Sequence, residues 1–181
     1  MRSDALRNRA RILDAAREQL TAHGSEVGMD QIAQAAGVAV GTLYRHFPTK
    51  RDLVQAVMTE FIQMLVDRGE SAAASLGPGE AIDRITEIIK SFTEEAAKNR
   101  AIKEAANALG APYFTDEMVE RGRVAMEVLV TAAAADGDLR PDVSADDIFL
   151  MMTTAPSTAT ESARDRWLSI VTAGIRRSGS S

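Results

Sequence analysis

The chain has 181 residues, 45% of them hydrophobic and none of them cysteine, and it carries a formal net charge of −5. This length accommodates one large or two small domains with a hydrophobic core, while the absence of cysteine excludes disulfides, thiolate metal sites and cysteine nucleophiles. Because no apolar run reaches the length of a membrane span and residues 1–4 do not begin a signal peptide, we expect a cytoplasmic protein with no membrane-spanning helix.

The whole chain is predicted to be all-α, because no segment alternates apolar and polar residues for long enough to indicate a strand. The first helix is expected over residues 5–22 and is followed by Gly24, since glycine is the usual residue just past a helix end. A second helix is expected over residues 29–36, where apolar residues recur at helical spacing. Proline stops helices, so a short third helix should end before Pro48.

Six further helices are expected after that point. A capping box formed by Thr49 and Asp52 opens the fourth, which should run to about residue 68 and be followed by a connection over residues 71–79. A similar box at residues 144–147 opens the eighth. The remaining helices are expected over residues 80–98, 101–109, 115–135 and 162–177.

The segment 37–50 reads Gly-Val-Ala-Val-Gly-Thr-Leu-Tyr-Arg-His-Phe-Pro-Thr-Lys. Two short helices joined by a glycine-containing turn describe a helix-turn-helix, whose second helix can enter the major groove of DNA. The segment matches every specified position of the pattern Gly-Val-x-x-Gly-Thr-Leu-Tyr-x-His-Phe-x-x-Lys, and on these residues the chain resembles the TetR family of transcriptional regulators. The resemblance implies a three-helix DNA-binding head over residues 1–49 and a six-helix body for effector binding and dimerisation over residues 50–181.

A helix that reads the major groove needs small or polar side chains at its front and donors to phosphate beside it. Thr42 offers a hydroxyl and a methyl group, and Lys50 lies at the start of the fourth helix, where free N–H groups also attract phosphate. By resemblance, Leu43 and Phe47 take core positions of the head. The predicted DNA-binding residues are Val40, Gly41, Thr42, Tyr44, Arg45, His46 and Lys50.

Two of these side chains have ordinary alternative explanations. Tyr44 also fits a core aromatic with its hydroxyl at the surface, and His46 also fits a solvent-exposed histidine. The chain departs from the usual family pattern at Ala39 and Val40. Ala39 cannot cap the third helix with its side chain, a loss of roughly 1 kcal/mol, and Val40 can make only apolar contact with a base.

The distribution of charge favours a DNA-reading head attached to a different kind of body. The first 51 residues carry eight Lys/Arg against five Asp/Glu, a net charge of +3, and the rest carries thirteen against twenty-one, a net charge of −8. A mildly basic module of this kind suits DNA binding, although many helical segments reach such a balance by chance.

Catalysis explains the sequence poorly. Of two histidines one lies in the helix-turn-helix, and the chain lacks Gly-x-Ser-x-Gly, His-Glu-x-x-His and phosphate-binding glycine-rich motifs. Paired acids at residues 94–95 and 146–147 are adjacent on their helices, so they do not converge on one site. We therefore expect no enzyme activity, no cofactor and no bound metal.

The body carries aromatic and methionine side chains that supply adaptable apolar surface, and each of them also fits an ordinary core, Trp167 among them. The resemblance implies that the fourth to seventh helices surround a pocket for a small, often apolar effector, and that the eighth and ninth form a dimer. Predicted effector-binding residues are Phe61, Met64, Phe92, Leu109, Tyr113, Phe114, Met118 and Met126. Predicted dimer-interface residues are Phe149, Met152, Trp167, Ile170, Val171 and Gly174.

The sequence therefore predicts a homodimeric one-component transcriptional regulator, of the kind that is usually a repressor. It would bind a palindromic double-stranded DNA operator and be released by a small apolar effector. The alternative is a DNA-binding regulator with no effector pocket, whose body serves only for dimerisation. A filled core would favour that alternative, and a cleft with converging polar groups would favour an enzyme.

Overall fold

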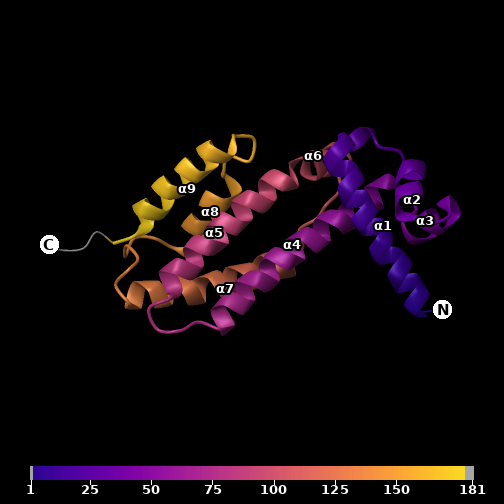
Figure 1. Ribbon diagram of the computed structural model, residues 1–181. Helices are drawn as coiled ribbons and strands as arrows, with labels where there is room; N and C mark the ends of the chain where they lie inside the picture. The colour runs from indigo at the N-terminus through magenta and orange to yellow at the C-terminus, as the bar shows by residue number, and fades with distance from the viewer. Residues whose placement is uncertain (1, 178–181) are drawn as a thin grey trace. The chain divides into compact units, whose positions relative to one another are not determined.

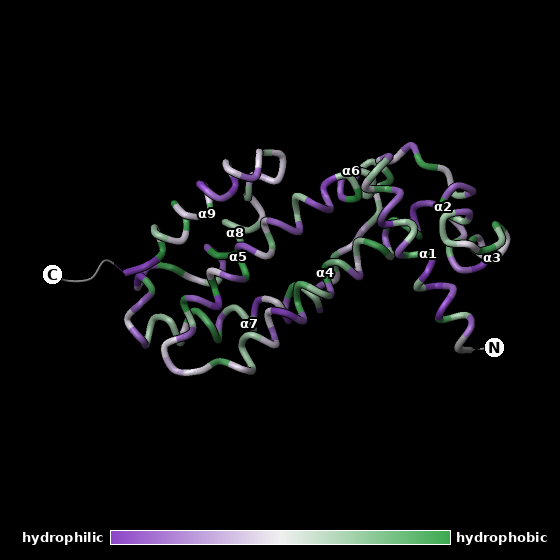
Figure 2. Tube along the Cα trace, viewed as in Figure 1, coloured by the Kyte–Doolittle hydropathy of each residue, from purple (hydrophilic) through white to green (hydrophobic). Residues whose placement is uncertain are grey.

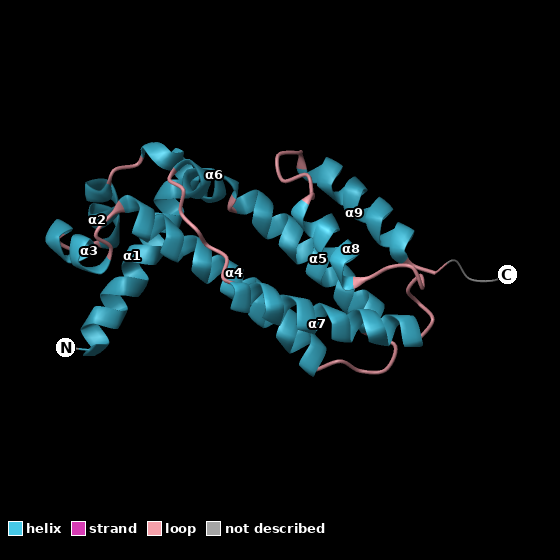
Figure 3. Ribbon diagram, turned by 180° about the vertical axis from the view of Figure 1, so that it is seen from behind, coloured by secondary structure: helices cyan, strands magenta, loops and turns pink. Residues whose placement is uncertain are grey.

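The computed structural model describes residues 2–177, and within that range the regular structure is helical, with no strand (Figures 1 and 3). The predicted all-α fold of a three-helix head and a six-helix body is confirmed. No helix of the described range is both long and apolar enough to cross a membrane. The helices are α1 (Arg2–His23), α2 (Met29–Ala36), α3 (Val40–His46), α4 (Lys50–Ala74), α5 (Ala81–Lys98), α6 (Arg100–Ala108), α7 (Asp116–Ala135), α8 (Ala145–Thr153) and α9 (Glu161–Ile175), with a 3₁₀ turn η1 (Gly24–Glu26).

The described chain forms two compact units. The first contains residues up to 62 together with residues 98–114, and the second contains residues 63–97 and the described residues from 115 onward. α6 belongs to the first unit because it packs against α1 and η1, although its place in the chain suggested the body. The functional boundary after residue 49 stays a prediction, because the compact units are defined by the packing of the chain and not by what each part does.

The core of the first unit gathers the apolar faces of α1, α2, α4 and α6, and α3 packs against α2 and adds Leu43. The apolar stripes of α1 and α2 are buried, as in any amphipathic helix of a folded protein. Figure 2 shows hydrophobic and hydrophilic residues alternating along these helices. The buried residues of these four helices include Ile12, Leu13, Ala16, Leu20, Met29, Ile32, Ala33, Ala36, Leu53, Val54, Val57, Met58, Ile102, Ala105 and Ala106.

α4 begins at the predicted capping box but ends later than predicted. The Asp52 N–H donates to Thr49 Oγ1 at 3.1 Å, and the Thr49 N–H donates to Asp52 Oδ2 at 3.0 Å. The helix continues to Ala74 because residues 71–74 are serine followed by three alanines, and alanine has the highest helix propensity. The expected connection over residues 71–79 is therefore wrong in its first half.

The second unit has its own core, formed by α5, α7 and α8 with the end of α9. The second capping box is confirmed, because the Asp147 N–H donates to Ser144 Oγ at 3.3 Å and the Ser144 N–H donates to Asp147 Oδ2 at 2.8 Å. The hydrogen bond from the Ser144 hydroxyl lowers the pKa of the Asp147 carboxyl. The core residues include Ile82, Ile85, Ile89, Met126, Leu129, Ala133, Ile148, Met152 and Ile175.

The chain segment that follows α9 is fastened to the loop between α7 and α8. An isolated antiparallel bridge joins Leu139 to Arg176, and the Arg140 N–H donates to the Ile175 carbonyl at 3.0 Å. The Arg176 guanidinium also lies 2.6 Å from Asp83 of α5. These contacts hold the C-terminal end of α9 on the second unit.

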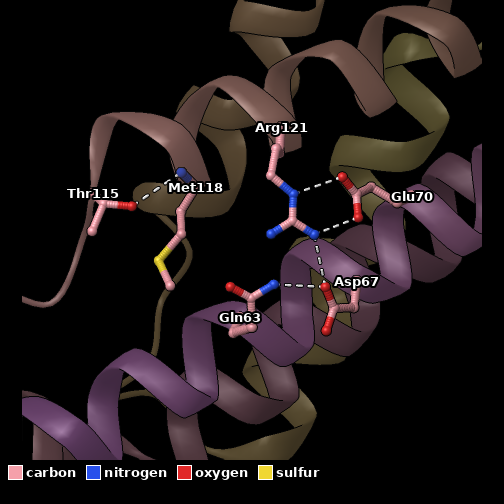
Figure 4. A network of polar contacts seen from close by, with 6 residues as sticks. All are labelled: Gln63, Asp67, Glu70, Thr115, Met118 and Arg121. Carbon is pink, nitrogen blue, oxygen red and sulfur yellow. Dashed lines mark hydrogen bonds and ion pairs between the residues drawn. The ribbon is translucent and has the colours of Figure 1, made fainter.

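Within the second unit, α4 and α7 are joined by a polar network (Figure 4). Arg121 of α7 donates from Nε to Glu70 Oε1 at 2.8 Å and from Nη2 to Glu70 Oε2 at 2.6 Å. Its Nη2 also donates to Asp67 Oδ1 at 2.9 Å, which accepts a further bond from Gln63 Nε2 at 2.7 Å. The hydrogen bonds between Arg121 and Glu70 raise the pKa of the guanidinium and lower the pKa of the carboxyl, so both groups stay charged.

Arg121→Met is expected to lower the thermal unfolding midpoint at neutral pH, because it leaves two carboxylates of α4 without their cation. Folding lowers the pKa of Glu70 from its ordinary 4.5, so the pair stabilises the fold above that pH and its contribution is lost as the pH falls through the lower, folded-state pKa. Circular dichroism melts should therefore show a wild-type advantage at neutral pH that shrinks in acid.

The matched control is Arg84→Met in α5, which removes only a contact with Glu80 one turn away on the chain. Exposed pairs of this kind contribute little, so its midpoint should change less than that of Arg121→Met. If the Arg121 variant were destabilised by the same amount at neutral and acidic pH, the ion pair would not be the cause.

Candidate nucleic-acid interface

The turn between α2 and α3 is built around Gly37, whose φ of 62° lies in the left-handed region that glycine adopts without strain. The Gly37 N–H donates to the Gln34 carbonyl and the Val38 N–H donates to the Ala33 carbonyl, each at 3.0 Å. Both bonds satisfy carbonyls at the end of α2, as in other glycine-terminated helices. Arg11 of α1 donates to the Gly37 carbonyl at 3.2 Å, which holds the turn against α1.

α3 buries one face and exposes the other. Leu43 and Phe47 are 0% and 5% exposed, as expected for core residues of the head. Val40 is 41% exposed. Tyr44 is 43% exposed, which is more than the exposure of a core aromatic side chain. The other predicted DNA-binding residues of α3 are exposed or partly exposed: Gly41, Thr42, Arg45 and His46.

Arg45 lies along its own helix. Its Nε donates to the Gly41 carbonyl at 3.1 Å and its Nη2 to Thr42 Oγ1 at 3.4 Å. Both contacts are at the surface, so a phosphate or a base edge can replace them when DNA docks. The N-terminus of α3 has no side-chain cap, because Ala39 stands at that position as the sequence predicted.

Lys50 has a contact that the sequence did not predict. Its Nζ donates to the Ser25 carbonyl of η1, which ties the start of α4 to the turn after α1. An ammonium carries three donors, so this bond leaves others for a phosphate. The contact was missed because η1 itself was not predicted, and nothing in the local sequence links residue 25 to residue 50.

Two arginines of α1 converge on α4. Arg9 Nη1 lies 2.9 Å from Glu60 Oε1, and Arg17 Nη2 lies 3.7 Å from Glu60 Oε2. The Arg9 guanidinium carbon also lies 5.7 Å from the centre of the Phe47 ring. The positions of these arginines on α1 gave no signal of this cluster, because only the tertiary fold brings residues 9 and 60 together.

The predicted effector-binding residues are distributed over both units. Phe61, Leu109, Tyr113 and Phe114 belong to the first, and Met64, Phe92, Met118 and Met126 belong to the second. Phe61, Met118 and Met126 are buried, whereas Phe114 is 55% exposed. Burial raises the pKa of the Tyr113 hydroxyl, and the rings of Tyr113 and Phe114 lie 4.9 Å apart. That these residues line one pocket stays a prediction.

The second unit also has an open groove of about 350 Å³ beside the N-terminus of α8. None of the predicted effector-binding residues lines it, and most of its lining side chains are polar or charged. The lining residues are Arg123, Glu127, Val130, Thr131, Ser144, Ala145 and Asp146.

The residues predicted for the dimer interface differ in exposure. Met152 is buried, while Phe149, Trp167 and Val171 are partly buried. Ile170 is 56% exposed, as is Leu150 at 60%, a residue of α8 that the sequence did not single out. Gly174 is exposed and has open space beside it. The structure describes every residue of α9, and only Ile175 among them is buried.

Comparisons with known proteins agree with this geometry. Residues 12–57, which contain α2, α3 and the start of α4, match the family described as "Bacterial regulatory proteins, tetR family". Residues 77–177 match the family described as "Transcriptional regulator SbtR-like, C-terminal domain". The two matches together include parts of both compact units.

Individual relatives support the same assignment. The HTH-type transcriptional regulator UidR of Escherichia coli K12 is 30% identical over 153 residues, which cover 80% of this chain and 75% of UidR. A TetR transcription regulatory protein from Mycobacterium vanbaalenii has 31% identity and a TM-score of 0.75, over 97% of this chain and 99% of that one. A TetR regulator from Streptomyces coelicolor has 27% identity and a TM-score of 0.72, over 94% and 99%. This chain therefore belongs to the TetR family of bacterial transcriptional regulators.

Proposed function

We propose that this regulator is a cytoplasmic, homodimeric repressor that binds a palindromic operator and is released by a small apolar effector. The DNA-binding part of this proposal rests on the two faces of α3. Val40, Thr42 and Tyr44 are exposed or partly exposed, while Leu43 and Phe47 are buried and anchor the helix. The proposed activity is binding rather than catalysis, and it uses no cofactor, metal ion or membrane.

In this proposal α3 enters the major groove. Thr42 meets a base edge or a thymine methyl, while Tyr44, His46 and Lys50 donate to phosphates. A helix of seven residues can reach only a few base pairs, so one head has little specificity. Two heads related by a two-fold axis double the contacts, and they favour an operator with the same symmetry.

The proposal places the dimer interface on α8 and α9. α9 carries Trp167, Ile170 and Val171, yet the second unit buries only Ile175 of this helix. Ile170 of α9 and Leu150 of α8 remain largely exposed, so both are available for an apolar contact. A second copy of the same surface would cover them through a self-complementary contact.

The effector half of the proposal rests on the apolar side chains of α4 to α7 and on the fold. Proteins of this fold include FadR of Bacillus subtilis, solved with stearoyl-CoA, and a gamma-butyrolactone receptor, at 18% and 20% identity. An effector would act by binding one arrangement of the two heads better than the other. A thermal-shift panel of apolar compounds tests this half. No shift with any compound would favour the alternative, a regulator whose body only dimerises.

Lys50→Ala tests the DNA-binding half. The operator probe is a duplex that the wild-type protein enriches from a random-sequence pool. We expect the variant to bind this probe more weakly and to lower the slope of log affinity against log salt by about one for each phosphate that the lysine neutralises in the wild-type complex.

Thr42→Ala should instead relax the preference at one or two base pairs and leave the slope unchanged.

The control for Lys50→Ala is Lys90→Ala, which removes the same charge from an exposed site on α5. It should change neither affinity nor slope. A wild-type protein that enriches no duplex would refute the proposed function. If Lys50→Ala lowered the affinity but kept the slope, the role of Lys50 would be its bond to Ser25 rather than a phosphate contact.

A further inference from the structure

α3 is a short helix with few attachments of its own. It has seven residues and no side-chain cap at its N-terminus. Leu43 fastens its middle and Phe47, the residue just past its end, fastens its C-terminal end, since both are buried. The orientation of α3 therefore depends on its packing against α2 and on the contacts that fix the Phe47 ring.

The Phe47 ring is covered by Arg9 of α1, whose guanidinium carbon lies 5.7 Å from the ring centre. A cation in this position is attracted by the face of the ring. The same guanidinium donates to Glu60 of α4 at 2.9 Å, so α1, α4 and the end of α3 meet at one side chain. Arg17 lies 3.7 Å from the other Glu60 oxygen and shares its charge.

From this geometry we infer that Arg9 and Glu60 are positioning residues for DNA recognition. Arg9 stacks on Phe47 and thereby sets the angle at which α3 meets DNA, and Glu60 holds Arg9 in place. The inference rests on the proposed docking of α3 and adds residues that do not touch DNA themselves. It runs against the simplest interpretation of a basic α1, in which each arginine grips a phosphate.

The salt dependence of DNA binding distinguishes the two interpretations. An arginine that contacts a phosphate releases a counterion, so its removal lowers the salt slope of binding by about 0.9. A positioning arginine releases none, so its removal weakens binding without changing the slope. For Glu60 the two interpretations predict opposite changes in DNA affinity. General electrostatics predicts that removal of a carboxylate strengthens binding to DNA, whereas removal weakens binding if Glu60 holds Arg9 in place.

The experiment measures binding of Arg9→Met and Glu60→Gln to the enriched operator duplex and to a scrambled duplex of the same composition, over a range of salt. We expect the operator affinity of both variants to fall by roughly 3- to 10-fold, as suits one partly exposed ion pair and one cation–π contact. The slope should stay at the wild-type value, and affinity for the scrambled duplex should change less, so the specificity ratio falls. Arg9→Lys, which keeps the cation on the ring, should recover part of the affinity.

Arg7→Met is the matched control, because Arg7 is an exposed arginine of the same helix whose ion pair is with Asp4, one turn away. It should leave the specificity ratio unchanged. Thermal melts of all variants identify a merely structural role, which would lower the midpoint but not the affinity of the folded protein.

Three results would overturn the inference. They are a slope reduced by about one in Arg9→Met, operator binding unchanged or tightened in Glu60→Gln, and a specificity ratio equal to that of the wild type in both variants. Failure of the proposed function looks different, because the wild-type protein itself would then enrich no duplex.

Discussion

Replacing Leu43 with alanine should unfold the DNA-binding surface and abolish operator binding. Leu43 is 0% exposed and is the main apolar anchor in the middle of α3. Truncation of a buried leucine costs about 2–5 kcal/mol in the free energy of unfolding, and α3 has few other attachments to compensate. Urea unfolding followed by circular dichroism measures the cost, and titration of the enriched duplex measures the remaining affinity.

The matched control is Val40→Ala on the same helix. Val40 is 41% exposed, so its truncation should change the free energy of unfolding by less than about 0.5 kcal/mol. Any effect on DNA should then be a change in base preference, since Val40 can offer only apolar contact. If Leu43→Ala kept wild-type affinity, the exposed face of α3 would not be the reading surface.

The second large effect is expected from Ile170→Glu. Ile170 is 56% exposed, so a glutamate there meets water in the isolated chain but a second apolar surface in the proposed dimer. We expect sedimentation to change from twice the chain mass of 19.4 kDa to the chain mass itself. Because two linked heads bind about 10²- to 10⁴-fold more tightly than one, operator affinity should fall by a similar factor.

Ser169→Glu adds the same charge to an exposed residue of α9 that lies about 100° around the helix from Ile170. It should remain dimeric and bind the operator. If the Ile170→Glu variant still formed a dimer with the wild-type dissociation constant, the interface would lie elsewhere. Far-ultraviolet circular dichroism of the variant distinguishes a folded monomer from an unfolded chain.

The sequence was most informative where structure is decided locally. The bounds of α2 were predicted at both ends, and the capping boxes at residues 49–52 and 144–147 form as expected, because caps depend on residues three apart. The end of α4 was predicted too early because a run of serine and alanine resembles a linker in composition, although alanine favours helix. The short turn η1 had no comparable signal.

The same distinction between local and long-range contacts applies to the candidate DNA-binding site. The exposed face of α3 followed from a motif of contiguous residues, so its members could be named in advance. The bond from Lys50 to η1 and the cluster of Arg9, Glu60 and Phe47 could not, because each joins residues more than 24 positions apart. Such contacts depend on how helices pack, and a single sequence does not report packing partners.

The discontinuity of the first unit has a consequence for the order in which the protein is made. Chains are synthesised from the N-terminus, and units fold as their parts emerge. The reading helix is translated early, but Ile102, Ala105 and Ala106 of α6 complete the core of the unit to which it belongs. We therefore expect the nascent chain to gain a stable DNA-binding surface only after α6 has left the ribosome, when α5 of the second unit is already outside.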